Sequence, residues 1–206
     1  MKRYGTVLAA AMLLLFAGCS VMGGKERPVM PGVKAGEIAG KPAAGKVTIS
    51  FSLTRIAGRS SNQYAIWIEN EAGQYLRTIF VTDYMARRQG WKVRQQSLTT
   101  WVKAANVPNT PQADLDAVSG STPQAGTYAV GWDLKDSSGR QVSAGVYTYR
   151  IEGSLLSENT VFWTGKIRVG GTSQTSQATV SYFPDGADKL GRTLISDVSA
   201  VYDPAP

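Results

Sequence analysis

The sequence predicts an all-β fold, an Ig-like antiparallel β-sandwich with one short inserted helix. About eight stretches rich in β-forming residues follow one another over roughly 155 residues, and segments of Gly, Pro, Ser and Asp separate them. The most regular stretch alternates apolar and polar residues, which is typical of a strand with one buried face. The sequence contains no internal repeat, so we expect a single folded domain.

The alternation is clearest in VTISFSLTR (47–55), where every second residue from Val47 to Leu53 is apolar. Two further stretches, 63–70 and 75–82, flank the short segment EAGQ and predict a β-hairpin. The remaining expected strands cover residues 126–134, 145–153, 160–169, 178–184 and 194–202.

One stretch interrupts the β pattern. Residues 91–105 place Trp91, Leu98 and Trp101 near helical spacing, and prolines at positions 108 and 111 lie just beyond. We therefore expect one helix of two to three turns, which packs on the sandwich through its tryptophans.

The segment around this expected helix is basic. No acidic residue occurs between Asp83 and Asp114. The same segment contains five cations, Arg87, Arg88, Lys92, Arg94 and Lys103. This pattern fits either a solvated helix face or a basic patch that meets a phosphate or an acidic partner.

The N-terminus reads as a targeting segment. Residues 1–18 begin with a short basic stretch and continue with an apolar core too short to span a bilayer, which predicts a signal peptide. They lead into FAGCS, which resembles the lipobox of bacterial lipoproteins and implies a lipid on Cys19. An ordinary cleaved signal with an incidental cysteine is the alternative. We expect residues 19–46 to form the lipidated cysteine with a flexible tether, and residues 47–206 to form the folded domain.

These features predict a periplasmic protein that is anchored to a membrane by lipid. The residue after the cysteine is Ser20 and not aspartate. By resemblance to enterobacterial sorting, this favours the outer membrane over the inner membrane. Once Lys2 and Arg3 leave with the signal, 20 basic and 15 acidic residues give a net charge of +5. A mildly basic surface favours anionic partners, and nucleic acid is not expected in this compartment.

The composition limits the chemistry of the protein. The chain has no histidine and one cysteine, which excludes Ser-His-Asp and Cys-His machinery and zinc sites built on these residues. No catalytic residue and no metal site is predicted. A hydrolase would have to use carboxylates, and the candidates are Asp114, Asp116, Asp133 and Asp136. Asp133 and Asp136 have a second interpretation, in which they bond the backbone of their own turn.

Residues 132–153, WDLKDSSGRQVSAGVYTYRIEG, resemble the Ig-like hairpin of flagellar hook-capping proteins. Tyr147 and Tyr149 would share a face with Ile151, and Trp132 would cap the core. With YAIWIENEAGQYLRTIFV before it and LISDVSAVYDP after it, the chain resembles the uncharacterised predicted periplasmic proteins of domain of unknown function 2271 over about residues 47–203. Members of that family are often associated with PepSY-type membrane proteins and with the periplasmic flavin transferase.

The stretch DAVSGST (116–122) resembles the site at which that transferase attaches FMN to a threonine. Asp116, Ser119 and Gly120 match the motif, and Thr122 would be the acceptor, while a serine stands at position 121 where alanine is usual. Gly120 would let the backbone turn and leave room for the flavin. The alternative is a plain surface loop, because these residue types are common in turns.

Three functions remain open on these observations. The first is a lipid-anchored, non-enzymatic binding or accessory module in the periplasm. The second is an FMN carrier for extracytoplasmic electron transfer, with FMN on Thr122 and a PepSY-type membrane redox protein as its partner. The third is a carboxylate-based cell-wall hydrolase.

Overall fold

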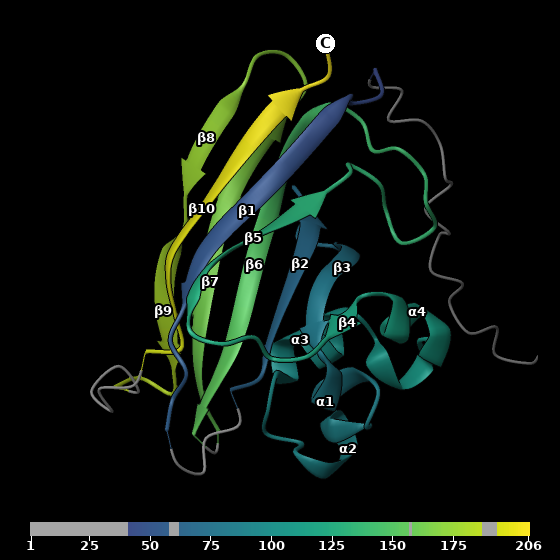
Figure 1. The fold of residues 1–206 in the computed structure, drawn as a ribbon. Helices are drawn as coiled ribbons and strands as arrows, with labels where there is room; N and C mark the ends of the chain where they lie inside the picture. Colours follow the sequence, from purple (N-terminus) through teal and green to yellow (C-terminus); the bar gives the residue numbers. More distant parts are fainter. Residues whose placement is uncertain (1–40, 58–61, 157, 187–192) are drawn as a thin grey trace, which may run out of the picture. The chain divides into compact units, whose positions relative to one another are not determined.

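The computed structural model describes residues 41–57, 62–156, 158–186 and 193–206. Two β-sheets pack face to face, and short helices lie against one of them (Figure 1). The prediction of an all-β sandwich with a small helical insertion is thereby confirmed.

The folded part starts inside the stretch that we expected to be a tether. Ala43 is buried, and its backbone N–H donates to the carbonyl oxygen of Val142 at 2.9 Å. The first strand begins at Gly45, two residues ahead of the expected start of the domain. The expected signal peptide (1–18), Cys19 and the tether up to residue 40 lie outside the described residues.

One sheet has four antiparallel strands. Their order across the sheet is β5 (Gly126–Trp132), β1 (Gly45–Leu53), β10 (Ile195–Pro204) and β8 (Gln174–Gln177). Strand β8 lies where the sequence predicted a turn. It adds to the edge of the sheet by pairing with β10, from Ser199 opposite Gln177 to Tyr202 opposite Gln174.

The other sheet has six strands. Their order is β4 (Ser119–Gly120), β3 (Tyr75–Thr82), β2 (Tyr64–Asn70), β6 (Gly145–Leu156), β7 (Asn159–Val169) and β9 (Thr179–Phe183). All neighbours are antiparallel except β3 and β4, which run parallel. The expected hairpin of β2 and β3 is confirmed, whereas β4 was not predicted.

The main core lies between the sheets and follows the predicted alternation. The apolar residues of β1 from Val47 to Leu53 point inward and are buried, while the polar residues between them are partly exposed. Tyr147, Tyr149 and Ile151 belong to the same buried cluster, as their shared face predicts. The ring of Trp132 meets that of Tyr147 edge-on at 5.1 Å and closes this part of the core.

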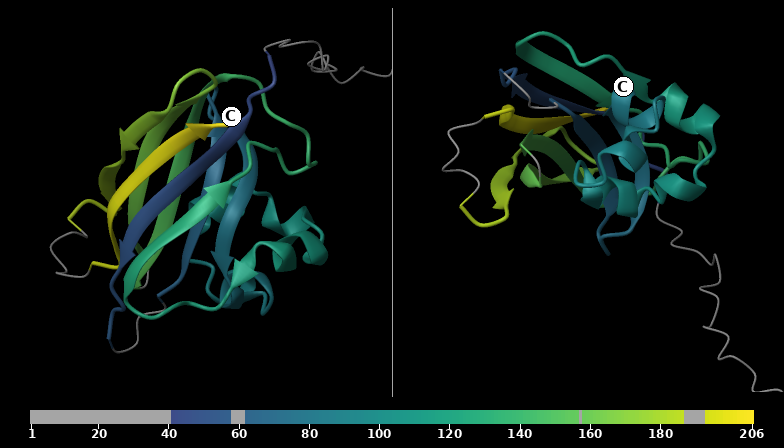
Figure 2. Two further views of the ribbon diagram at one scale, coloured as in Figure 1. Left: turned by 45° about the horizontal axis from the view of Figure 1, so that its top comes forward. Right: turned by 90° about the horizontal axis from the view of Figure 1, so that it is seen from below.

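The chain between β3 and β5 forms a helical insert, residues 83–117, beside one end of the sandwich (Figure 2). It contains α1 (Asp83–Ala86), α2 (Gly90–Val93), α3 (Thr99–Ala104), the 3-10 turn η1 (Val107–Asn109) and α4 (Gln112–Ala117). The prediction of one helix over 91–105 is therefore wrong. Leu98 has a left-handed φ of 54°, which ends any continuous helix there, and Pro111 precedes α4 as its N-cap.

The insert packs on the outer face of the six-stranded sheet. Trp67 of β2 and Trp101 of α3 are fully buried there, together with Leu98 and Met85. The expected packing through tryptophan is thus seen for Trp101, while Trp91 is only partly buried. The outer face of β2, β3 and β6 becomes a second, smaller core, and its polar side chains lose access to water.

Candidate functional site

The stretch DAVSGST connects the insert to the sheets. Asp116 lies in the last turn of α4, and Ser119 and Gly120 form β4, which pairs with Val81 and Thr82 of β3. The N–H of Val81 also donates to the carbonyl oxygen of residue 118 at 3.0 Å. Much of this expected loop is therefore regular structure with a fixed backbone. We call residues 116–122 the attachment segment.

Gly120 is required by a close approach. A Cβ atom at this position would lie 2.9 Å from Cε2 of Phe80, which is closer than side-chain atoms tolerate. The Phe80 ring cannot easily move away, because it stacks on buried Tyr64 at 5.0 Å between centroids. We expected Gly120 to let the backbone turn, but its backbone belongs to strand β4. The close approach of Phe80, and not a turn, is the reason for a glycine here.

Arg87 braces the attachment segment from α1. Its Nε donates to Oγ of Ser119 at 2.8 Å, and its Nη2 donates to the backbone carbonyl of Asp116 at 3.3 Å. The same guanidinium forms an ion pair with Oδ1 of Asp83 at 3.3 Å. Oδ2 of Asp83 in turn accepts a hydrogen bond from Oγ of Ser121 at 3.2 Å. Sequence reasoning missed this bracing, although Asp83 and Arg87 show the i, i+4 spacing of a helical ion pair.

Thr122 lies just past the braced residues. Its side chain is partly buried, and Oγ1 donates to the backbone carbonyl of Asn62 at 3.4 Å. Hydroxyl hydrogen bonds in proteins are usually about 2.5–3.0 Å long, so this bond is weak. The threonine oxygen therefore stands on a rigid segment without a strong partner of its own.

A cluster of aromatic rings lies near this segment, and only one of them is partly exposed. Phe51 lies 5.7 Å from Tyr64 and 6.1 Å from Tyr128 between ring centroids. Tyr128 is partly exposed, and its hydroxyl donates to the carbonyl of Gln124 at 2.8 Å. Gln124 is two residues after Thr122, so this hydrogen bond connects the partly exposed ring of Tyr128 to the chain just beyond the attachment segment.

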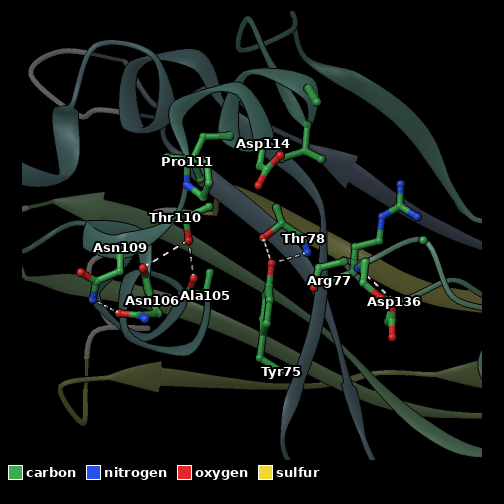
Figure 3. Close-up of a pocket in the computed structure, with 16 residues that line it drawn as sticks. Tyr75, Arg77, Thr78, Ala105, Asn106, Asn109, Thr110, Pro111, Asp114 and Asp136 are labelled. Carbon is green, nitrogen blue, oxygen red and sulfur yellow. Dashed lines mark hydrogen bonds between the residues drawn. The ribbon is translucent and has the colours of Figure 1, made fainter.

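A cavity of about 490 Å³ opens beside α4 (Figure 3). It lies between β3, the end of the insert and the turn at 136–139. Its inner wall is a closed hydrogen-bond network, since the hydroxyls of Tyr75 and Thr78 are 2.8 Å apart and Nε1 of Trp101 donates to Oγ1 of Thr78 at 2.9 Å. Burial raises the pKa of Tyr75, so its hydroxyl stays protonated.

The carboxylates proposed for a hydrolase have structural partners. Oδ1 of Asp136 accepts from the N–H groups of Ser138 and Arg140 at 2.9 and 3.0 Å. Burial acts to raise the pKa of Asp136, but the hydrogen bonds from Ser138 and Arg140 outweigh it and lower the pKa below its usual value. Asp133 pairs with Arg77 at 2.9 Å. Oδ1 of Asp133 also accepts from the N–H of Lys135 at 3.3 Å. Both aspartates thus bond the backbone of their own turn, and Asp136 lacks the raised pKa that a general acid needs, so the geometry favours their interpretation as turn-forming residues.

Asp114 and Asp116, the other two carboxylates of that hypothesis, lie on α4. Oδ1 of Asp116 accepts from Nε2 of Gln112 at 2.8 Å and lies 3.9 Å from Nε of Arg87. Asp114 is exposed and lines the cavity. Within the described ranges, no group of three or more acidic or cysteine side chains could hold a metal ion.

One ionisable residue that sequence reasoning missed is deeply buried. Glu152 of β6 is fully buried under the insert and accepts hydrogen bonds from the N–H groups of Trp101 at 2.7 Å and Thr100 at 3.2 Å. Burial raises its pKa to about 7 in spite of these bonds. Glu152 takes the place of an N-cap for α3, because Leu98 at that position has no side-chain cap.

The comparisons with known proteins extend over most of the folded part. A family model described as predicted periplasmic protein (DUF2271) matches residues 44–182, from β1 through the insert and the attachment segment to β9. No curated protein and no solved structure matches the chain. Among the residues that the structure describes, no helix is long and apolar enough to cross a membrane.

Proposed function

We propose, from the premise that this chain belongs to the DUF2271 family of predicted periplasmic proteins, that it is a non-enzymatic accessory module. In this proposal a lipid on Cys19 anchors the protein to a membrane, preferably the outer membrane. Its functional group is FMN, linked by a phosphoester to Thr122. The bound flavin supplies one- and two-electron redox chemistry to a PepSY-type membrane protein.

One observation carries the proposal. The hydroxyl of Thr122 is weakly bonded, at 3.4 Å, yet the residues before it are held by β-pairing and by Arg87. A transferase can therefore take the hydroxyl at small cost, while the rigid segment presents it in one position. Attachment joins Oγ1 of Thr122 to the flavin-side phosphorus of a flavin dinucleotide and breaks the pyrophosphate bond of this donor. A nucleoside monophosphate leaves with the proton of the hydroxyl, and the protein gains the mass of FMN less one water.

The neighbouring residues fit a phosphoester. The link carries one negative charge, and the half-exposed guanidinium of Arg87 bonds two residues of the attachment segment. Tyr128 offers a partly exposed aromatic face on which a flavin ring could stack. These residues hold the charge and the ring, and they do not enter the redox chemistry themselves.

The departure from the usual motif has a local explanation. Serine replaces alanine at position 121, and its hydroxyl donates to Oδ2 of Asp83 at 3.2 Å. The serine side chain thus points to α1 and leaves the acceptor at position 122 free of competition. We expect a Ser121→Ala variant to accept FMN as well as the wild type does.

The experiment is co-expression with a periplasmic flavin transferase. We expect flavin fluorescence on a denaturing gel and a mass gain of FMN less one water. Thr122→Ala should lose both signals, and Ser121→Ala is the matched control that should keep them. Fluorescence that persists in Thr122→Ala removes this threonine as the site. An unlabelled wild type, beside a known flavinylated protein that is labelled in the same cells, removes the flavin hypothesis.

The anchor is tested independently of the flavin. Wild-type protein should sediment with membranes and require detergent for release, because several acyl chains hold a protein firmly. Cys19→Ala should not incorporate labelled fatty acid. Labelling of that variant would contradict lipidation at Cys19 and would leave the proposal for Thr122 untouched.

A further inference from the structure

The far end of the helical insert carries a compact basic surface. We call Arg88, Lys92, Arg94 and Lys103, together with Trp91 and Val93, the basic tip. Its residues come from α2, from the turns on either side of α2 and from α3. None of its residues lines the cavity, and within the described ranges none forms a hydrogen bond or ion pair with the attachment segment. Neither of the functions above uses the basic tip.

The cations of the basic tip lack counter-charges. No acidic residue occurs between Asp83 and Asp114, and within the described ranges none of the four cations forms an ion pair. Arg87, the neighbouring cation, differs from them because it is paired with Asp83. Uncompensated charge of one sign at one surface attracts anions.

Aromatic rings lie under two of these cations. Nζ of Lys92 lies 5.0 Å from the centre of the Trp91 ring, and the guanidinium of Arg94 lies 5.0 Å from that of Tyr84. Cation–π contacts of this length orient the charged groups without neutralising them. Both charges therefore stay available to an external anion.

An apolar residue protrudes between the charges. Val93, which separates Lys92 and Arg94, is 73% exposed and is the most exposed large apolar side chain among the described residues. Trp91 and Lys103 of the basic tip line a hollow of about 320 Å³. Val93 thus adds an exposed apolar side chain to a surface whose cations have no acidic partner.

We propose that the basic tip binds the surface of an anionic phospholipid membrane. The four cations meet lipid phosphates, while Val93 and the edge of Trp91 enter the boundary between headgroups and acyl chains. Basic residues around a small apolar group are typical of interfacial binding, and tryptophan favours this depth of the bilayer. An acidic protein partner would match the charge but would leave the protruding valine without a role.

The position of the tip is compatible with the expected anchor. The tip and the start of β1 lie at opposite ends of the sandwich (Figure 1). The 12 residues of β6 span this distance, roughly 40 Å at about 3.3 Å per residue. Lys41 is 22 residues from Cys19, and such a stretch reaches at most about 75 Å when fully extended. One membrane can therefore hold the lipid and contact the tip.

The test is sedimentation with vesicles. The chain from Ser20 to Pro206 is used, because it contains every described residue and lacks the lipid, which would bind vesicles by itself. We expect binding to vesicles with 30% phosphatidylglycerol and none to pure phosphatidylcholine. Binding should disappear at 1 M salt, where the Debye length falls to about 3 Å.

Two variants that remove the same charge separate the contribution of the basic tip to vesicle binding from that of the net charge of the protein. Lys92→Gln/Arg94→Gln should weaken binding about 30-fold, since each cation near an anionic surface contributes roughly fivefold. Lys166→Gln/Arg168→Gln is the matched control, because both residues are exposed on β7 and the pair removes the same charge. We expect this control to weaken vesicle binding less than threefold. Val93→Asn keeps all charges and should weaken vesicle binding severalfold.

Three results would overturn the proposal. They are equal losses in the two charge variants, equal binding to neutral vesicles, and binding to soluble polyglutamate without binding to anionic vesicles. All substituted residues are exposed, so the variants should fold, and their circular dichroism spectra establish this before the vesicle measurements.

Discussion

Glu152 makes the stability of the domain depend on pH in a direction opposite to that of most carboxylates. Its pKa rises from 4.5 to about 7 because it is buried, which means that the folded state favours the protonated form. Below pH 4.5 the group is protonated in both states, and above pH 7 it is ionised in both states. The free energy of unfolding should therefore fall as the pH rises from about 4.5 to about 7.

The magnitude follows from the size of the pKa change. One pKa unit corresponds to about 1.4 kcal/mol, so a rise from 4.5 to about 7 corresponds to roughly 3 kcal/mol. Glu152→Gln removes this contribution, because the amide does not ionise. The amide oxygen can still accept one of the two N–H bonds from α3, at a loss of about 1 kcal/mol for the other. We expect the variant to be more stable than the wild type at pH 8 and less stable than the wild type at pH 4.5.

The assay is urea unfolding of the wild type and Glu152→Gln between pH 4.5 and 8. Glu158→Gln is the control, since Glu158 is exposed and its substitution should leave the pH dependence of the wild type unchanged. The quantity of interest is the difference in unfolding free energy between each variant and the wild type. If Glu152→Gln keeps the wild-type slope between pH 5 and 7, the reasoning about burial under the insert is refuted.

Two further predictions test the packing. Gly165→Ala should cost about 1–3 kcal/mol in urea unfolding, because its new Cβ would overlap the buried ring of Tyr149. Gly131→Ala, whose Cβ meets no atom, should change stability by less than about 0.5 kcal/mol, and equal losses would contradict the packing. Arg150→Met should cost about 3 kcal/mol, because it removes the cation 2.8 Å from buried Glu69 and leaves this carboxylate only its hydrogen bond from Nε1 of Trp67. Unchanged stability would show that this pair is solvated.

The strands could be predicted because their pattern is local. The alternation in β1 places Val47, Ile49 and Leu53 on one face, and the structure buries these three residues between the sheets. Tyr147 and Tyr149 follow the same rule in β6. A period of two specifies a face without knowledge of the rest of the chain, so this part of the fold is readable from the sequence.

The helical insert could not be predicted in the same way. The spacing of Trp91, Leu98 and Trp101 suggests one helix, but Leu98 adopts a left-handed conformation, and Trp101 packs against Trp67 of a distant strand. Tertiary packing determines these short helices, and helical spacing alone does not show it. The same packing covers the outer face of β6, and for this reason Glu152 looks like a solvent-facing strand residue in the sequence.

The candidate site was located in the sequence, but its structure was not foreseen. The residue types of DAVSGST indicate a polar loop, whereas Ser119 and Gly120 pair with β3 in parallel. Parallel pairing joins segments far apart in the chain and leaves no local pattern. The bracing by Arg87 depends on the same long-range contact. The reason for Gly120 likewise becomes visible only once Phe80 lies beneath it.

The most direct test of the central claim is peptide mass spectrometry of protein co-expressed with the flavin transferase. Trypsin should release residues 104–135 as one peptide, because no Lys or Arg lies between Lys103 and Lys135. We predict that this peptide carries FMN less one water and that fragmentation places the group on Thr122. An unmodified peptide, or a flavin on Ser119 or Ser121, would contradict the account.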